Sequence, residues 1–167
     1  MKTETVTLLD DTKQVVNEIT YGDWLTTRNE GNDFDNDVAL IRACTGLAVD
    51  AIDSLKVPDY NELRRSAIKL NNPSQELKAG ASVITLSKPV FTIMGDTTAL
   101  INITMPLVKV SRELSRITDH TARMSYMIKS TTGIADLNSL PMSDYSLLAD
   151  CVPDFFAQGA AFFRASK

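Results

Sequence analysis

The sequence predicts an α+β protein that is mostly helical and contains two tandem copies of a β-hairpin followed by a small helical bundle. The first observation is an internal similarity between residues 41–63 (IRACTGLAVDAIDSLKVPDYNEL) and residues 128–148 (IKSTTGIADLNSLPMSDYSLL). Both segments carry Ile, Thr-Gly, Ser-Leu and Asp-Tyr in the same order. The second observation is that strand-like alternation of polar and apolar residues precedes each segment. Such similarity within one chain indicates a repeated structural unit.

Each copy begins with two predicted strands, which we expect to pair as a hairpin. Thr5–Leu8 (TVTL) resembles Val83–Leu86 (VITL), and Glu18–Thr20 (EIT) resembles Asn102–Thr104 (NIT). The second hairpin has the longer loop, which contains a Lys-Pro and a Gly-Asp dipeptide. We therefore expect the same strand order in both copies, with different turns.

Three dipeptides align the helical parts of the copies. The Thr-Gly dipeptides lie 87 residues apart, whereas the Ser-Leu and Asp-Tyr dipeptides lie 85 residues apart, so the second copy lacks two residues in between. After this gap, both copies place apolar residues at i, i+3, i+7 and i+10, which form one face of an α-helix. The residues of the repeated motif are Thr45, Gly46, Leu55, Asp59 and Tyr60 in the first copy and Thr132, Gly133, Leu140, Asp144 and Tyr145 in the second.

Helix boundaries follow from capping signals. The acidic residues of DFDNDVALIRACTG favour a helix start, and Gly46 is a suitable stop. In the second copy, we predict a helix over about 107–117 and another over about 119–131 that ends at Gly133. The last helix is predicted to continue through DFFAQGAAFFRA, with a kink at Pro153.

The seam between the copies, NNPSQELKAGA, has the Asn, Pro and Gly content of a linker. We therefore place a first repeat at residues 1–72, a linker at residues 73–80 and a second repeat, with an extended C-terminal helix, at residues 81–167. A chain of 167 residues is long enough for two small units that support each other.

The composition is that of an ordinary globular protein, with 44% hydrophobic and 23% charged residues. No apolar run approaches the roughly 18 residues that a membrane span needs, and the polar N-terminus does not resemble a signal peptide. A net charge of −4 argues against nucleic acid as a partner. Residues 1–75 carry a charge of −5 and residues 76–167 a charge of +1, which favours attraction between the halves or different faces for partners.

The sequence contains no recognisable constellation for catalysis. His120 is the only histidine and Cys44 and Cys151 lie far apart, unlike the ligands of a zinc site. The Asp residues of DFDND match the start of a calcium loop, but Val38 and Cys44 occupy the positions that need Gly and Glu. Phosphate-binding loops and nucleophile elbows are absent from the sequence. We therefore predict no enzyme, metal or cofactor, and two buried, reduced thiols.

Two side-chain patterns are candidates for partner binding. A basic stripe at i, i+3 and i+7 is either a solvated helix face or a contact for an acidic partner. An aromatic stripe at i, i+1, i+7 and i+8 near the C-terminus either packs on its own core or binds another chain. The basic stripe consists of Lys109, Arg112 and Arg116, and the aromatic stripe of Phe155, Phe156, Phe162 and Phe163.

The repeated unit resembles the tail assembly chaperones of contractile-tailed phages such as Mu and P2. The resemblance rests on the strand pair, the pattern Ile-x-x-x-Thr-Gly-hydrophobic, a Leu four residues before Asp-Tyr, and a helix that ends in Asp-Phe. It covers nearly the whole chain when the chain is taken as two copies. The matching residues are Val83–Leu86, Ile128–Ile134, Leu140–Tyr145 and Asp154-Phe155 in the second copy, and Thr5–Leu8, Ile41–Leu47 and Leu55–Tyr60 in the first.

The chain also departs from the pattern of that family. The family usually has a single unit, and Ser-Pro-Glu-Asp typically opens its last helix, where this chain has Lys56–Asp59 and Pro141–Asp144. The first copy ends in AIKL instead of an acidic-aromatic pair.

The resemblance implies a non-enzymatic chaperone in the cytoplasm of the infected host. Such a protein binds the long, helical tape measure protein and keeps it soluble while tail-tube subunits assemble around it. The tail-tube protein and further copies of the chain are additional candidate partners. Two alternatives stay open: a permanent component of the phage tail or baseplate, and a small regulatory protein that binds another helix.

Overall fold

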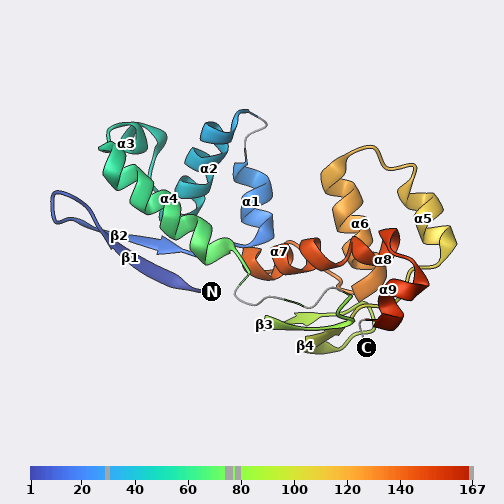
Figure 1. Cartoon of the computed structure of the whole chain (residues 1–167). Coiled ribbons are helices and arrows are strands. Elements are labelled where there is room, and N and C mark those ends of the chain that lie inside the picture. Colours follow the sequence, from blue (N-terminus) through green and yellow to red (C-terminus); the bar gives the residue numbers. More distant parts are fainter. Residues whose placement is uncertain (29–30, 74–76, 78–79, 166–167) are drawn as a thin grey trace. The chain divides into compact units, whose positions relative to one another are not determined.

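Two units make up the chain, which we describe from a computed structural model (Figure 1). The first unit comprises Met1–Asn72 and Pro141–Ser143, and the second comprises Pro73–Leu140 and Asp144–Lys167. The predicted linker at residues 73–80 lies largely outside the described part of the chain. The structure describes residues 1–28, 31–73, 77 and 80–165.

Of the residues that the structure describes, helices account for 50% and strands for 18%, which confirms the predicted α+β class. The strands form two separate antiparallel hairpins. Up to Asn72 the elements are β1 (Thr3–Thr7), β2 (Lys13–Asn17), α1 (Tyr21–Thr27), α2 (Asp33–Thr45), α3 (Val49–Asp53) and α4 (Val57–Asn71). They are followed by β3 (Val83–Phe91), β4 (Thr97–Asn102), α5 (Val108–Leu114), α6 (His120–Thr132), α7 (Met142–Cys151), α8 (Asp154–Ala157) and α9 (Ala160–Ala165).

The first hairpin alternates exposed polar side chains with apolar side chains that face the core. Val6 and Val16 are buried, whereas their neighbours along each strand are exposed or half-buried. In the turn, Asp11 adopts a φ of 64°, and the N–H of Thr12 donates to the side chain of Asp10 at 3.0 Å. Such a local bond is one reason why Asp favours turns. Helices α2 and α4 pack on this hairpin.

The core of the first unit lies between the hairpin and these two helices. Burial of apolar side chains is the main favourable contribution to the stability of a small folded unit. The buried core residues are Val6, Val16, Ile19, Ile41, Cys44, Ile52, Leu63, Ala67 and Leu70.

Pro141–Ser143 adds a short edge segment to the first unit. Thr20 and Pro141 form an isolated antiparallel bridge, and the N–H of Met142 donates to the carbonyl of Ile19 at 2.8 Å. The partly buried side chain of Met142 packs against the core of the first unit. A segment that lies far along the chain therefore completes the edge of the first hairpin.

Glu18 brings a buried carboxylate to the same edge. Its side chain is 1% exposed. The hydroxyl of Ser143 donates to Oε1, and the backbone N–H of Lys2 donates to Oε2 at 2.9 Å. Because burial of a carboxylate is costly without hydrogen bonds, these two donors allow Glu18 to remain inside the unit.

The second hairpin differs from the first by an irregularity in its longer strand. The register of β3 on β4 shifts between Thr85 and Val90, which indicates a β-bulge. Helix α5 contacts α6. The buried apolar residues of the second unit include Ile84, Leu86, Val90, Ile101, Ile103, Leu114, Ile128, Ile134, Leu137, Leu140, Leu147, Leu148, Val152 and Phe155.

The two hairpins end in the same register. Asn17, the last residue of β2, faces Thr3, and Asn102, the last residue of β4, faces Val83. Each second strand thus ends opposite the first residue of its partner. By this register, residues 18–20 correspond to residues 103–105. The similarity between EIT and NIT instead aligns residues 18–20 with residues 102–104, so the two alignments differ by one residue.

Two predicted helices are shorter than expected. The continuous C-terminal helix is wrong, because α7 ends at Cys151 and the backbone of Gln158 is extended between α8 and α9. Pro153 explains the first break, since proline cannot donate the N–H that a continuing helix needs. Helix α5 ends at Leu114, so Arg116 lies in the turn after it.

Candidate functional site

The repeated Asp residues bind the hairpin in each unit, at its turn in the first unit and at its first strand in the second. In the first unit, Asp59 Oδ1 accepts the N–H of Leu9 at 2.9 Å. In the second unit, both oxygens of Asp144 accept the N–H of Ser87 at 3.0 Å, and Oδ2 also accepts the Ser87 hydroxyl at 2.7 Å. The Asp at the start of the last long helix therefore joins that helix to the hairpin in both units.

The repeated Thr-Gly dipeptides end helices in the same way. Gly46 and Gly133 follow α2 and α6 with φ angles of 75° and 69°, in the left-handed region that favours glycine. The hydroxyl of Thr45 donates to the carbonyl of Ile41 at 2.7 Å, and the hydroxyl of Thr132 donates to the carbonyl of Ile128 at 2.7 Å. These motif residues have a structural role.

The remaining motif residues show where the units differ. Leu140 is fully buried and Tyr145 is 7% exposed, whereas Leu55 and Tyr60 are only half-buried. The ring of Tyr60 stacks on Phe34 with a centroid distance of 5.3 Å, and Phe34 is 57% exposed. Of the two motif tyrosines, Tyr60 is therefore the one that borders an open surface.

A groove of about 460 Å³, which we call the first-unit groove, lies beside Tyr60. Helices α2, α3 and α4 supply its walls. Val57 at its edge is 70% exposed. The apolar lining of the first-unit groove consists of Phe34, Ile52, Leu55, Val57 and Tyr60.

Charged residues border the first-unit groove. Arg64 Nε lies 2.5 Å from Asp37 Oδ2, and Asp53 lines the groove as well. Burial, together with the charge of Asp37, raises the pKa of the Tyr60 hydroxyl, which makes no hydrogen bond within the described residues. The groove therefore combines an apolar floor, a hydroxyl without a described partner, and a partly acidic border.

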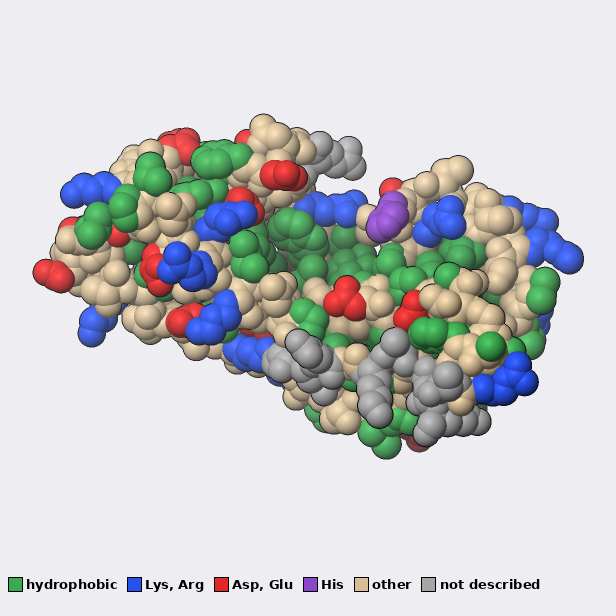
Figure 2. Space-filling model, in the orientation of Figure 1, with side chains coloured by type: hydrophobic (Ala, Val, Ile, Leu, Met, Phe, Trp, Pro, Cys, Tyr) green, Lys and Arg blue, Asp and Glu red, His purple; other side chains and the backbone are tan. Residues whose placement is uncertain are grey.

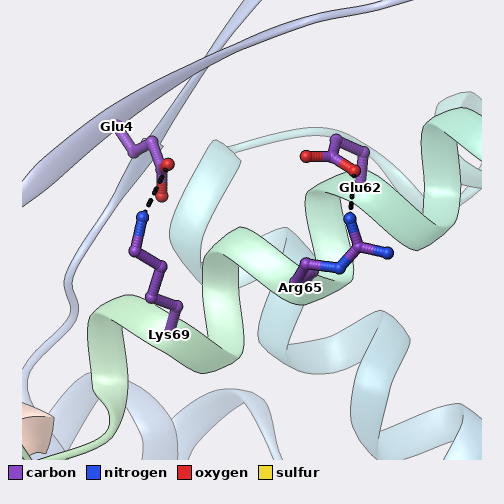
Figure 3. Close-up of polar contacts among 4 residues, drawn as sticks. All are labelled: Glu4, Glu62, Arg65 and Lys69. Carbon is purple, nitrogen blue, oxygen red and sulfur yellow. Dashed lines mark hydrogen bonds and ion pairs between the residues drawn. The ribbon is translucent and has the colours of Figure 1, made fainter.

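Helix α4 uses its polar face for local ion pairs (Figure 3). Lys69 Nζ lies 3.0 Å from Glu4 on β1, and Arg65 lies 2.7 Å from Glu62 on the same helix. On the face drawn in Figure 2, acidic and basic side chains intermingle with exposed hydrophobic ones over the first unit. Exposed ion pairs of this kind contribute little to stability, so these charges serve mainly to keep the surface polar.

A second groove, of about 640 Å³, lies between β4 and the end of α6, and we call it the second-unit groove. Its border includes Ile93, Met94 and Leu100, which are 72%, 83% and 52% exposed. Thr104 and Thr131 lie at its other side, where the N–H of Thr104 donates to the carbonyl of Thr131 at 2.8 Å.

The predicted basic stripe is not a helical stripe in the structure. Lys109 and Arg112 are exposed on α5, but Arg116 lies beyond the end of that helix. The spacing i, i+3, i+7 therefore does not place the three charges on one helix face. Helix α5 also carries an acidic residue, Glu113, next to Arg112, and Glu113 accepts a hydrogen bond from the hydroxyl of Tyr126 on α6.

The predicted aromatic stripe is a folded cluster. Phe155 is 5% exposed and belongs to the core of the second unit, so it is not available to a partner. Phe163 on α9 lies 5.0 Å from Phe155 and 5.2 Å from Phe162, measured between ring centroids. Phe156, Phe162 and Phe163 are half-buried. Because three short helices replace one long helix, the rings pack on each other.

The described residues contain no group of three or more His, Cys, Asp and Glu side chains that could hold a metal ion. His120 is exposed beside Arg123. Cys44 and Cys151 are free, buried thiols, and burial raises their pKa values to about 11 and about 12. Within the described part of the chain, no helix is long and apolar enough to cross a membrane.

The first-unit groove was not predicted from the sequence. Phe34 lies in the acidic segment DFDND, and an aromatic residue among four acidic or amide residues is the one signal that could have indicated an exposed ring. Val57 gave no signal, because its exposure depends on where α4 begins.

No protein-family model, curated protein or solved structure matches the chain.

Proposed function

We propose that the two units are divergent copies of one ancestral unit. Both contain a hairpin, a helix that ends at a left-handed glycine, and a later helix whose Asp accepts a backbone N–H of the hairpin. The apolar phase of that later helix is also shared. Leu63, Ala67 and Leu70 are buried in the first unit, as are Leu148, Val152 and Phe155 in the second.

We further propose that the chain is a non-enzymatic tail assembly chaperone of a contractile-tailed phage, which binds the tape measure protein in the host cytoplasm. The observation that carries this proposal is the first-unit groove, where Phe34 and Val57 remain exposed beside the Asp-Tyr motif. A tape measure protein offers long amphipathic helices, and apolar grooves between helices are a common seat for such helices.

The charges at the groove indicate which helix would fit. Among the charged residues that line the groove, Asp53 makes no ion pair within the described residues, and Asp37 and Arg64 neutralise each other. The border is therefore net acidic. We expect the bound helix to present an apolar stripe flanked by Lys or Arg, because opposite charges at the rim favour association and set its register.

Co-expression with the tape measure protein of the same phage tests this proposal. The chain should keep the tape measure protein soluble and co-purify with it. Phe34→Ser should reduce the recovered complex severalfold. Phe91→Ser is a matched control, because Phe91 is also 57% exposed but belongs to β3 and does not line the first-unit groove. Equal losses for both variants, or no complex with the unmodified chain, would contradict the proposal.

The alternative of a permanent tail or baseplate component uses the same surfaces for lasting contacts. Mass spectrometry of purified virions separates the two functions, because a chaperone leaves before the particle is complete and a structural component stays. For the regulatory alternative, Lys109→Glu combined with Arg112→Glu should abolish binding to an acidic helix and leave tape measure binding unchanged.

A further inference from the structure

The edge of the first hairpin shows how a segment of this chain binds a hairpin end. Pro141 lies opposite Thr20 in an antiparallel bridge, and Met142 donates its N–H to the carbonyl of Ile19. The side chain of Met142 packs against the core behind the hairpin. The binding segment is the three residues that precede Asp144 of the repeated motif.

The equivalent edge of the second unit is not occupied in this way. By the register of the two hairpins, Ile103–Met105 corresponds to Glu18–Thr20. The N–H of Ile103 bonds Ser82 at 2.7 Å, just as the N–H of Glu18 bonds Lys2 at 2.8 Å. No donor among the described residues pairs with the carbonyl of Thr104, the counterpart of Ile19. Met105 is 53% exposed, and the second-unit groove borders Thr104.

The equivalent binding segment is also exposed. The Asp-Tyr dipeptides of the two units lie 85 residues apart, and the same offset aligns Pro141–Ser143 with Lys56–Pro58. Lys56 is the N-cap of α4 and makes no capping bond with its side chain. The N–H of Val57 is not paired with any described acceptor, and the side chain of Val57 is 70% exposed.

We propose that the chain associates with itself head to tail, with Lys56–Pro58 of one copy bound along Ile103–Met105 of the next. The N–H of Val57 then donates to the carbonyl of Thr104, and Lys56 lies opposite Met105. The inference rests on the equivalence of the two units proposed above, and the occupant is a second copy because the first unit already binds the matching segment of this same chain.

The proposed contact between copies is weaker than the contact within the first unit. The hydroxyl of Ser143, which binds the buried Glu18 in the first unit, has no counterpart in Pro58. The contact between copies therefore lacks one hydrogen bond of the first unit, and we expect association that depends on concentration. Because the two surfaces lie on different units, the contact is heterologous and produces rings or open chains.

Disulfide trapping between two single variants tests the register directly. Residues opposite each other in an antiparallel pair have Cα atoms about 4.5–5.5 Å apart, within the range that a disulfide spans. Lys56→Cys mixed with Met105→Cys should give a covalent dimer on oxidation. Because the native thiols are buried and protonated, the unmodified chain should give none.

The matched control is Lys56→Cys mixed with Val108→Cys, since Val108 is 78% exposed and lies three residues from Met105. A yield at least about tenfold higher for the Met105 pair would support the register. Equal yields would overturn it, and circular dichroism shows whether all variants fold.

Light scattering of the unmodified chain provides the second measurement. We expect a mass that rises with concentration, and Met105→Glu should return it to the monomer value. A constant monomer mass would overturn the inference but leave the tape measure proposal intact, because the co-expression test does not require self-association. If the disulfide trap still forms but the chain does not bind the tape measure protein, the proposed function is overturned and the inference of self-association is kept.

Discussion

In the first unit, Tyr60 is half-buried and stacks on an exposed Phe34 beside an open groove, whereas in the second unit the corresponding Tyr145 is 7% exposed. The preceding Asp residues accept a backbone N–H of the hairpin in both units. The Asp of the motif therefore bonds the hairpin in both units, whereas, within the described residues, the Tyr of the motif lines a surface groove only in the first unit. The two units thus differ in the exposure of the motif tyrosine and share the hydrogen bond of the motif Asp, and this contrast can be tested at corresponding positions.

The largest expected effect is at the centre of each core. Leu63 and Leu148 occupy equivalent helix positions and are both fully buried. Leu63→Ala and Leu148→Ala should each lower the free energy of unfolding by about 2–5 kcal/mol, because each leaves a cavity. Chemical denaturation measures the loss, and Leu100→Ala, at a position 52% exposed, is the control. A loss below about 1 kcal/mol at either core site would contradict the shared core position.

The next effect distinguishes the two Asp residues. Asp144 is 5% exposed and receives three hydrogen bonds from Ser87, whereas Asp59 is half-buried and receives one from Leu9. Asp144→Asn should cost about 1–3 kcal/mol of stability, because a buried acceptor is lost, and Asp59→Asn should cost less than about 1 kcal/mol. Urea titrations of both variants provide the comparison, and a larger loss for Asp59→Asn than for Asp144→Asn would contradict this prediction.

The two helix stops should respond alike. Gly46→Ala and Gly133→Ala force a side chain into a left-handed backbone conformation, which costs about 1 kcal/mol or more at each position. A Cβ at Gly46 meets no atom within 4 Å and one at Gly133 lies 3.6 Å from Ile93, so backbone conformation and not crowding is responsible. Gly159→Ala is the control, because that glycine has open space and no positive φ. Melting curves that show equal effects at all three sites would contradict this explanation.

The smallest effect concerns the thiols. Burial raises the pKa of Cys44 to about 11 and that of Cys151 to about 12 from an ordinary value of 9.0. The folded state therefore holds these protons more tightly than the unfolded state. Their contribution to stability is fully present below pH 9 and declines as the pH rises toward the folded values.

Titration of the native chain with a thiol reagent at pH 8 should reveal little reaction until denaturant is added. The matched variants Cys44→Ala and Cys151→Ala assign any residual reaction to one unit. Rapid modification of either native thiol would contradict its burial.

The sequence predicted the fold class and much of the local geometry because these depend on short-range patterns. The glycine stops at residues 46 and 133 follow from the cost of positive φ for other residues, and the last long helices follow from apolar spacing. The burial of Leu63 and Leu148 was therefore predictable from position alone.

The candidate site was less predictable because it depends on how elements meet. The aromatic stripe assumed one helix, but Pro153 and the extended Gln158 separate three. Arg116 was assigned to a helix that ends earlier. The place of Pro141–Ser143 on the first hairpin depends on a contact between distant parts of the sequence, for which no local pattern exists.

The buried Glu18 gives the order of synthesis a role in folding. A growing chain that has emerged through Asn72 contains the hairpin and helices of the first unit, but Pro141–Ser143 has not yet been made. Until then, the carboxylate of Glu18 lacks the hydroxyl of Ser143, and the carbonyl of Ile19 lacks the N–H of Met142. The edge of the nascent first unit therefore stays unpaired until a segment about seventy residues further along the chain has been translated. The first unit can complete its fold only after most of the second unit has left the ribosome.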